Sequence, residues 1–325
     1  MKRLLILLLV GFIGIYYFFG FSSCADESGD GGALTYLIVG FDDVAENTDV
    51  MLLLNYRPED NTAAVVQIPR DTYAAFNTSQ NKINQIYSGA RYGGKGAAES
   101  MSILTEAISD TLGISIDGYA GFTTDALVRL VDNFGGVDIE LPHSLEIPDG
   151  EGNKISLKAG KNHLTGNEAR GFIRYRSGYS LGDLSRIDAQ KLFLSAFIKR
   201  VRTGMSVRTA LNCISDSGEG MVTNLKTRDI LKMLMKKSGR LSDLKTIYAT
   251  LPGASVQSES GLWYYSVSRS AADELLALSG FHRTHAFDPE ARLCRAGDAS
   301  FTKIYNDTSV KPRIYDDTLS GLEIK

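Results

Sequence analysis

Three apolar segments of strand length follow one another closely in the first quarter of the chain. They cover residues 35–40, 50–56 and 62–68, and turn-forming residues at 57–61 separate the last two, which predicts a β-hairpin. Strands are also expected at 119–122, 246–251 and 263–267, and helices at 97–112, 124–134, 183–202, 207–215, 227–236 and 270–279. This mixture predicts one α/β domain of about 250 residues, which we place at 34–282, followed by an irregular tail at 283–325.

Composition narrows the possible functions. The chain has 325 residues, 43% of them hydrophobic, and its 35 basic and 38 acidic residues give a net charge of −3. This balance argues against a nucleic-acid-binding protein, which needs a basic surface to neutralise phosphates. The three cysteines include no CxxC pair and the four histidines no HExxH, so a structural zinc site is not expected. Cys213 and Cys294 could form a disulfide or both remain free thiols.

The N-terminus carries a membrane signal. Lys2 and Arg3 precede 18 uncharged residues, Leu4 to Phe21, and acidic residues follow, which predicts a single-pass anchor with the bulk of the chain outside the cytoplasm. We therefore expect a membrane anchor or signal segment at 1–24 and a polar tether at 25–33. A cleaved signal peptide is one alternative, and a lipoprotein acylated at Cys24 is another.

Carboxylates gather where the first strand ends and the second begins. Asp42 and Asp43 follow the first apolar run, and Asp49 precedes the second. Two carboxylates across a short loop can share Mg²⁺, which prefers carboxylate oxygens together with substrate phosphate. The other interpretation is that these aspartates only cap turns.

Four arginines are candidates for a phosphate or pyrophosphate site, because the guanidinium fork matches phosphate oxygens. If residues 174–176 are extended, the two arginine side chains there lie on the same side. On the helix expected at 183–202, Arg186 and Gln190 share a stripe with core residues. Salt bridges to Asp183 or Asp188 are the alternative. Neither a Walker A motif nor GxGxxG is present, so a nucleotide-binding fold is not predicted. The four arginines are Arg70, Arg174, Arg176 and Arg186.

Eight short fragments in order resemble the LytR-CpsA-Psr family, most strongly over residues 35–202. Members of that family are membrane-anchored enzymes, mainly of Gram-positive bacteria, that move teichoic acid, capsule or a similar glycopolymer from a polyprenyl-pyrophosphate carrier to peptidoglycan. The fragments are Leu37–Asp42, Asn47–Asp49, Ile68–Thr72, Lys82–Asn84, Asn133–Asp138, Leu164–Ala169, Arg174–Arg176 and Asp183–Gln190.

The resemblance implies a fold and a set of roles. The fold is a central, mostly antiparallel or mixed sheet flanked by helices, with an apolar channel for the polyprenyl tail. Asp42 and Asp49 would hold Mg²⁺ or Mn²⁺ against the pyrophosphate. Family members usually carry an arginine where this chain has Asn47, so its site has one positive charge fewer. The residues implied at the pyrophosphate are Arg70, Lys82, Arg174, Arg176, Asp183, Arg186 and Gln190.

These observations predict a phosphotransferase in which a peptidoglycan hydroxyl attacks the phosphorus next to the sugar. The catalytic candidates are Arg70, Asp71, Arg174 and Arg176, with Asp71 a candidate base for the acceptor proton. The rival hypothesis is a non-catalytic binder of the same lipid-linked precursor, consistent with Asn47. A transcriptional regulator conflicts with the anchor and with the acidic net charge.

Overall fold

A central mixed sheet organises the chain in the computed structural model. The structure describes residues 33–42, 47–57, 59–74, 76, 78–149, 152–175, 183–204, 209, 220–225, 243–258, 260–285 and 312–315, with the backbone alone for 183–188. The sheet has the order β13-β10-β3-β2-β1-β4-β9. Its strands are β1 (Leu34–Phe41), β2 (Thr48–Arg57), β3 (Thr62–Ile68), β4 (Gly118–Phe122), β9 (Met221–Thr223), β10 (Lys245–Thr250) and β13 (Ile314–Tyr315).

The pairing of the strands follows from their connections. β1, β2 and β3 are joined by short connections and pair antiparallel, so the predicted hairpin at 50–68 is confirmed. β4 pairs parallel to β1, and β10 pairs parallel to β3. The helices α2 and α3 lie in the connection that leads from β3 to β4, as expected of the long connection that a parallel strand requires. β2 and β3 are buried along nearly their whole length, which is expected of strands whose two faces are both covered.

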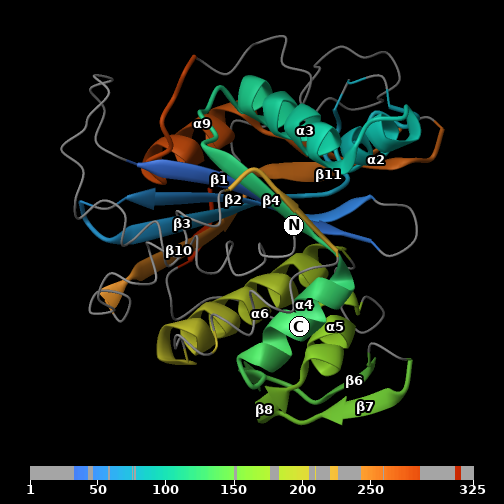
Figure 1. Cartoon of the computed structure of the whole chain (residues 1–325), viewed down its shortest axis with the longest axis vertical. Helices are drawn as coiled ribbons and strands as arrows, with labels where there is room; N and C mark the ends of the chain where they lie inside the picture. Colours follow the sequence, from blue (N-terminus) through green and yellow to red (C-terminus); the bar gives the residue numbers. More distant parts are fainter. Residues whose placement is uncertain are drawn as a thin grey trace.

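Helices cover both faces of the sheet, so the predicted three-layer architecture is confirmed. One layer contains α2 (Gln85–Tyr92), α3 (Ala97–Leu112) and α9 (Arg269–Leu278), and the other α4 (Thr124–Asn133), α5 (Gly166–Arg174) and α6 (Asp183–Gly204) (Figure 1). Each layer has its own hydrophobic core against the sheet. The helices expected at 207–215 and 227–236 lie outside the described residues, apart from position 209.

Three small antiparallel strand pairs were not expected from the sequence. β5 (Val137–Leu141) pairs with β8 (Gly160–Leu164), β6 (Leu145–Pro148) with β7 (Lys154–Leu157), and β11 (Gly253–Gln257) with β12 (Trp263–Val267). Of these six strands, the sequence predicted only β12. The others have four or five residues each, which gives too few alternations for a clear periodic signal.

The predicted anchor at 1–24 lies outside the described residues. Within the part of the chain that the structure describes, no helix is both long and apolar enough to span a membrane.

α5 is set in place by its N-terminus and by two glycines. Thr165 caps the helix reciprocally with Glu168: the Thr165 backbone N–H donates to the Glu168 carboxylate at 2.8 Å, and the Thr165 hydroxyl accepts from the Glu168 N–H at 3.4 Å. Gly166 and Gly171 allow close packing, because a Cβ at either would collide with the carbonyl of Val128 or Pro148.

Thr165→Ala should lower the free energy of unfolding by about 1 kcal/mol, because it leaves a helix donor without its cap. Thermal unfolding measures the effect. Because Thr165 and Glu168 form one reciprocal cap, adding Glu168→Ala should cost less than the sum of the two single changes. Strict additivity would contradict the reciprocal cap.

Candidate functional site

A cavity of about 410 Å³ lies between the sheet and the layer of α4 and α6. Most of its lining is apolar, and its charged lining residues are Asp42, Asp49, Arg174, Lys191 and Arg202. The apolar lining includes Ile38, Val50, Leu52, Leu54, Val65, Phe122, Leu127, Leu130, Ile173, Phe193, Leu194, Phe197, Ile198, Val201, Leu244 and Tyr248.

Two carboxylates reach this cavity from neighbouring strands. Asp42 follows β1 directly, and Asp49 is the second residue of β2; both line the cavity. The β1–β2 ladder is irregular at Gly40 and Phe41. The loop is closed by two hydrogen bonds: the Asp42 N–H donates to the Asn47 carbonyl at 2.9 Å, and the Asn47 N–H donates to Asp42 Oδ1 at 3.2 Å. The strand pairing thus brings the two predicted metal ligands to one edge of the sheet.

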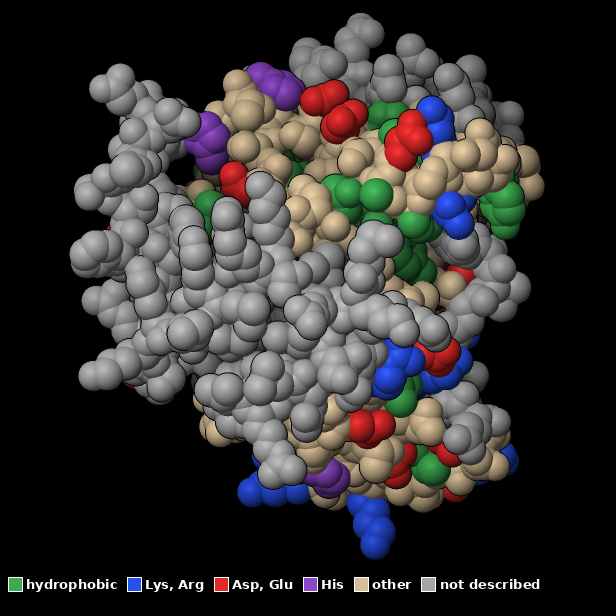
Figure 2. Space-filling view, viewed as in Figure 1, with side chains coloured by type: hydrophobic (Ala, Val, Ile, Leu, Met, Phe, Trp, Pro, Cys, Tyr) green, Lys and Arg blue, Asp and Glu red, His purple; other side chains and the backbone are tan. Residues whose placement is uncertain are grey.

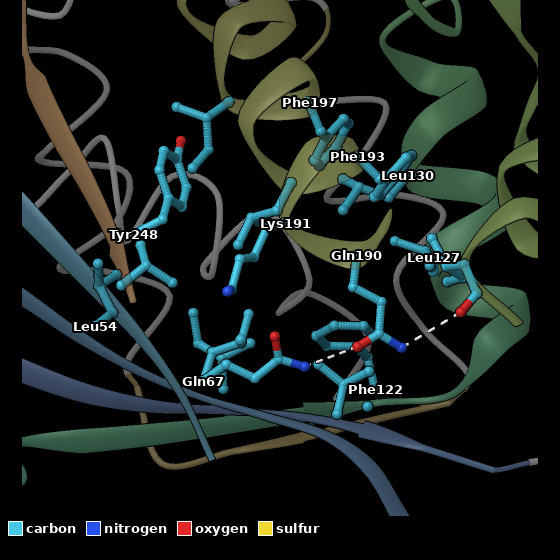
Figure 3. Close-up of a pocket in the computed structure, with 18 of the residues that line it drawn as sticks. Leu54, Gln67, Phe122, Leu127, Leu130, Gln190, Lys191, Phe193, Phe197 and Tyr248 are labelled. Carbon is cyan, nitrogen blue, oxygen red and sulfur yellow. Dashed lines mark hydrogen bonds between the residues drawn. The ribbon is translucent and has the colours of Figure 1, made fainter. Parts of the chain in front are cut away.

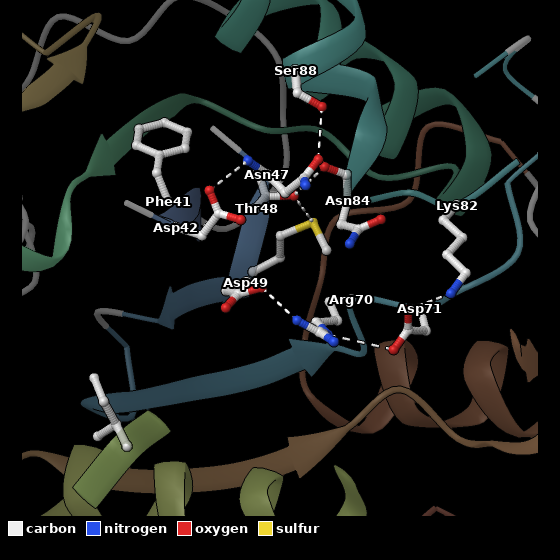
Figure 4. A network of polar contacts seen from close by, with 12 residues as sticks. Phe41, Asp42, Asn47, Thr48, Asp49, Arg70, Asp71, Lys82, Asn84 and Ser88 are labelled. Carbon is white, nitrogen blue, oxygen red and sulfur yellow. Dashed lines mark hydrogen bonds and ion pairs between the residues drawn. The ribbon is translucent and has the colours of Figure 1, made fainter. Parts of the chain in front are cut away.

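A row of alternating charges continues from Asp49 (Figure 4). Arg70, which follows β3, donates from Nη1 to Asp49 Oδ1 at 2.7 Å. Its Nε lies 3.4 Å from Asp71 Oδ2, and Lys82 Nζ donates to Asp71 Oδ1 at 2.8 Å. The side chains are all largely buried, with Lys82 13% exposed. Three predicted site residues, Arg70, Asp71 and Lys82, therefore form one connected network with Asp49.

The network is braced by the β11–β12 hairpin. The Tyr265 N–H donates to the Asp71 carbonyl at 2.8 Å, and the Tyr73 N–H donates to the Tyr265 carbonyl at 3.0 Å. Lys82 Nζ also lies 5.4 Å from the centre of the Tyr264 ring. These contacts fix the backbone of the Arg70–Asp71 turn from its far side.

Arg174 and Gln190 line the cavity from the opposite layer. Arg174 is the last residue of α5, and the backbone becomes extended only at Tyr175, so the sequence-based assumption of an extended segment is wrong for Arg174. The Gln190 amide oxygen accepts from Gln67 Nε2 at 2.7 Å, and its Nε2 donates to the Ile173 carbonyl at 3.3 Å (Figure 3). Gln190 therefore links β3 to the end of α5.

Three predicted residues cannot be assigned a position in the site. Arg176 lies outside the described residues, and for Asp183 and Arg186 only the backbone of α6 is described.

The donor set fits a magnesium ion bound together with a phosphate ligand. Among the described residues, no group of three or more histidine, cysteine or acidic side chains could hold a metal ion alone. Mg²⁺ is commonly bound by one or two carboxylates plus substrate phosphates and water. Asp42 and Asp49 supply that pair at the cavity.

Two polar residues near the site were not among the predicted site residues. Asn84 is 8% exposed, and its Oδ1 has no hydrogen-bond partner among the described residues. Lys191 is 6% exposed and lines the cavity.

The Asn47 side chain turns to α2, where its Oδ1 accepts a hydrogen bond from the Ser88 hydroxyl at 2.8 Å. The Asn47 side chain is thus held against a helix.

One face of the molecule shows how the charged side chains of the described residues are distributed. On the face seen in Figure 2, the basic side chains of the described residues are scattered among acidic ones and form no continuous basic patch.

Comparisons with known proteins agree with this architecture. A model of the LytR_cpsA_psr family matches residues 22–278. A Bacillus cereus protein named polyisoprenyl-teichoic acid–peptidoglycan teichoic acid transferase TagU is 28% identical over 247 residues, which are 74% of this chain and 76% of that protein. The crystal structure of Bacillus subtilis TagV superposes with a TM-score of 0.62 at 24% identity, covering 76% of this chain and 95% of that one. A structure described as TagT bound to LI-WTA gives a TM-score of 0.60 at 20% identity over 79% of this chain and 94% of that one.

Proposed function

The chain belongs to the LytR-CpsA-Psr family, and we propose that it is a transferase that moves a glycopolymer from a polyprenyl-pyrophosphate carrier to peptidoglycan. The observation that carries this proposal is the junction between an apolar cavity and a cluster of carboxylates and guanidinium groups. A lipid pyrophosphate has the same two parts, an apolar chain and an anionic head.

The cavity suits the chain of such a lipid. Its volume of about 410 Å³ lies within the range of small-molecule sites. Aliphatic and aromatic side chains from the sheet, α4 and α6 form most of the wall. Burying an isoprenoid chain there removes apolar surface from water, which favours binding by about 25 cal/mol per Å².

The charged end suits the reaction. The acceptor hydroxyl oxygen forms a bond to the phosphorus next to the sugar and releases its proton to solvent, and the bond from that phosphorus to the bridging oxygen breaks. The products are an acceptor–phosphate–glycan and polyprenyl phosphate, which leaves with the bridging oxygen. Arg70 and Arg174 are the described guanidinium groups placed to stabilise charge on the phosphoryl oxygens. If water takes the place of the acceptor, the same step hydrolyses the pyrophosphate.

Asp42 and Asp49 would hold Mg²⁺ or Mn²⁺. When bound, the ion would neutralise charge on the pyrophosphate oxygens. In this proposal Asp71 positions the Arg70 and Lys82 side chains, because its two carboxylate oxygens pair with them. Protonation of Asp71 would weaken both ion pairs. This positioning role differs from the role of base that the sequence suggested.

The compartment follows from the chemistry of the substrates. Lipid carrier and peptidoglycan meet at the outer face of the cell membrane, and the apolar run at 4–21 provides a tether of suitable length and polarity.

The rival function, a binder that holds the precursor, is favoured by one observation: Asn47 contributes no positive charge to the site, and its side chain accepts a hydrogen bond from Ser88. Incubation of the protein with lipid-linked glycan, Mg²⁺ and a peptidoglycan fragment separates the two, because a transferase releases polyprenyl phosphate and a binder does not.

If Asp42 and Asp49 hold a metal ion, the affinity of the protein for a prenyl pyrophosphate should depend on that ion. Calorimetry with geranylgeranyl pyrophosphate should give tighter binding with Mg²⁺ than without it, because Asp42 and Asp49 would hold an ion that neutralises charge on the anionic head. Asp42→Asn should remove most of that difference. Asp60→Asn, a carboxylate in the β2–β3 turn paired with Arg57, is the matched control and should keep it. Equal affinity with and without Mg²⁺ in the wild-type protein would contradict the metal assignment.

A further inference from the structure

Lys191 is a buried cation in the wall of a largely apolar cavity. It lies on α6 directly after Gln190, is 6% exposed and lines the cavity with hydrophobic neighbours such as Phe193 and Leu194. Figure 3 shows its ammonium group pointing toward the sheet. A buried ammonium group needs partners that stabilise its charge.

An aromatic ring faces the ammonium group. Lys191 Nζ lies 5.0 Å from the centre of the Tyr315 ring, within the range of a cation–π interaction. Tyr315 belongs to β13, which pairs with β10 beside the cavity-lining residue Tyr248. The site thus already stabilises this cation with π electrons.

The sheet register places Lys191 along the tail rather than at the charged head. Tyr315 pairs with Tyr248, Tyr248 with Val65, and Val65 with Leu54. Leu54 is five residues along β2 from Asp49, a distance of about 17 Å at the usual strand rise. The ammonium group therefore lies over a row of the sheet well removed from the carboxylates.

We propose that Lys191 is a specificity residue that favours an unsaturated isoprenoid chain over a saturated chain of equal length. This inference rests on the proposed function. A polyprenyl chain carries one carbon–carbon double bond in every five-carbon unit, and the π density of a double bond attracts a cation as the face of an aromatic ring does, though more weakly. A saturated chain offers the ammonium group nothing but aliphatic surface. Lys191 thereby makes the wall selective without a hydrogen bond to the lipid.

The test compares two twenty-carbon ligands, geranylgeranyl pyrophosphate and its fully hydrogenated counterpart, phytanyl pyrophosphate. The full chain is purified in detergent with Mg²⁺, and the ratio of the two Kd values is measured for each protein. Lys191→Met, which keeps the length of the side chain and removes its charge, should reduce the preference for the unsaturated ligand by about three- to tenfold. Lys191→Gln provides a second neutral variant in case the first fails to fold. Lys199→Met, which removes the same charge from an exposed position of the same helix, should leave the ratio unchanged.

If Lys191 has only a structural role, its replacement weakens the binding of both ligands equally. The ratio of the two Kd values then stays at the wild-type value. That outcome would overturn the inference and leave the proposed function intact. If the wild-type protein binds neither ligand, the lipid-binding function itself is wrong and the inference falls with it.

Discussion

Arg70→Ala should lower the rate of glycopolymer transfer by about a hundredfold or more, the effect expected when one group that stabilises transition-state charge is removed. Arg70 is the guanidinium that joins Asp49 to the Asp71–Lys82 pair. Its loss would remove a positive charge beside the reacting phosphoryl group and also leave Asp49 without its partner. The measurement is the release of polyprenyl phosphate per enzyme under single-turnover conditions.

Arg57→Ala is the matched control for that change. Arg57 ends β2 on the opposite edge of the sheet and pairs with Asp60 at 2.9 Å. The Arg57→Ala variant should transfer the glycopolymer at the wild-type rate. A similar loss in both variants, or a collapse of the melting temperature in Arg70→Ala, would show that the arginine acts through stability and not through the reaction.

Leu127→Trp should weaken binding of a long prenyl pyrophosphate by close to a hundredfold while leaving inorganic pyrophosphate unaffected. Leu127 lies on α4 and lines the cavity (Figure 3), so an indole there would occupy space that the tail needs. Excluding about 100 Å² of tail surface costs about 2.5 kcal/mol, which corresponds to that factor in Kd. Leu278→Trp on the exposed face of α9, where the leucine is 56% exposed, is the control. Equal losses for the long lipid and for inorganic pyrophosphate would contradict the assignment of the cavity to the tail.

The layers of the fold could be predicted because their elements are long and strongly periodic. The predicted helix at 97–112 is α3 without change of boundary, and the first three strands differ from β1, β2 and β3 by at most two residues at an end. α5 was missed, although Thr165 and Glu168 have the spacing of a capping box, which is a readable signal of a helix start. Recognising it would have placed Arg174 at the end of a helix.

The edge of the site could be predicted in part, because strand ends bring Asp42, Asp49 and Arg70 together. The pairing of Lys82 with Asp71 could not be predicted, since it depends on a loop between them whose path has no periodic signal. The bond between Gln67 and Gln190 joins residues 123 positions apart and follows only from the packing of α6 against the sheet. Lys191 was overlooked because it lies 100° around the helix from Gln190, outside the apolar stripe, although the cavity extends around that side of α6.

The identity of the products tests the central claim most directly. The full chain is incubated with a glycan-linked polyprenyl pyrophosphate, Mg²⁺ and a peptidoglycan fragment, and the products are analysed by mass spectrometry. Transfer predicts polyprenyl monophosphate and a peptidoglycan fragment carrying the glycan through one phosphate, in equal amounts. Recovery of the intact lipid precursor bound to the protein, with no modified fragment, would contradict the transferase and identify a binder.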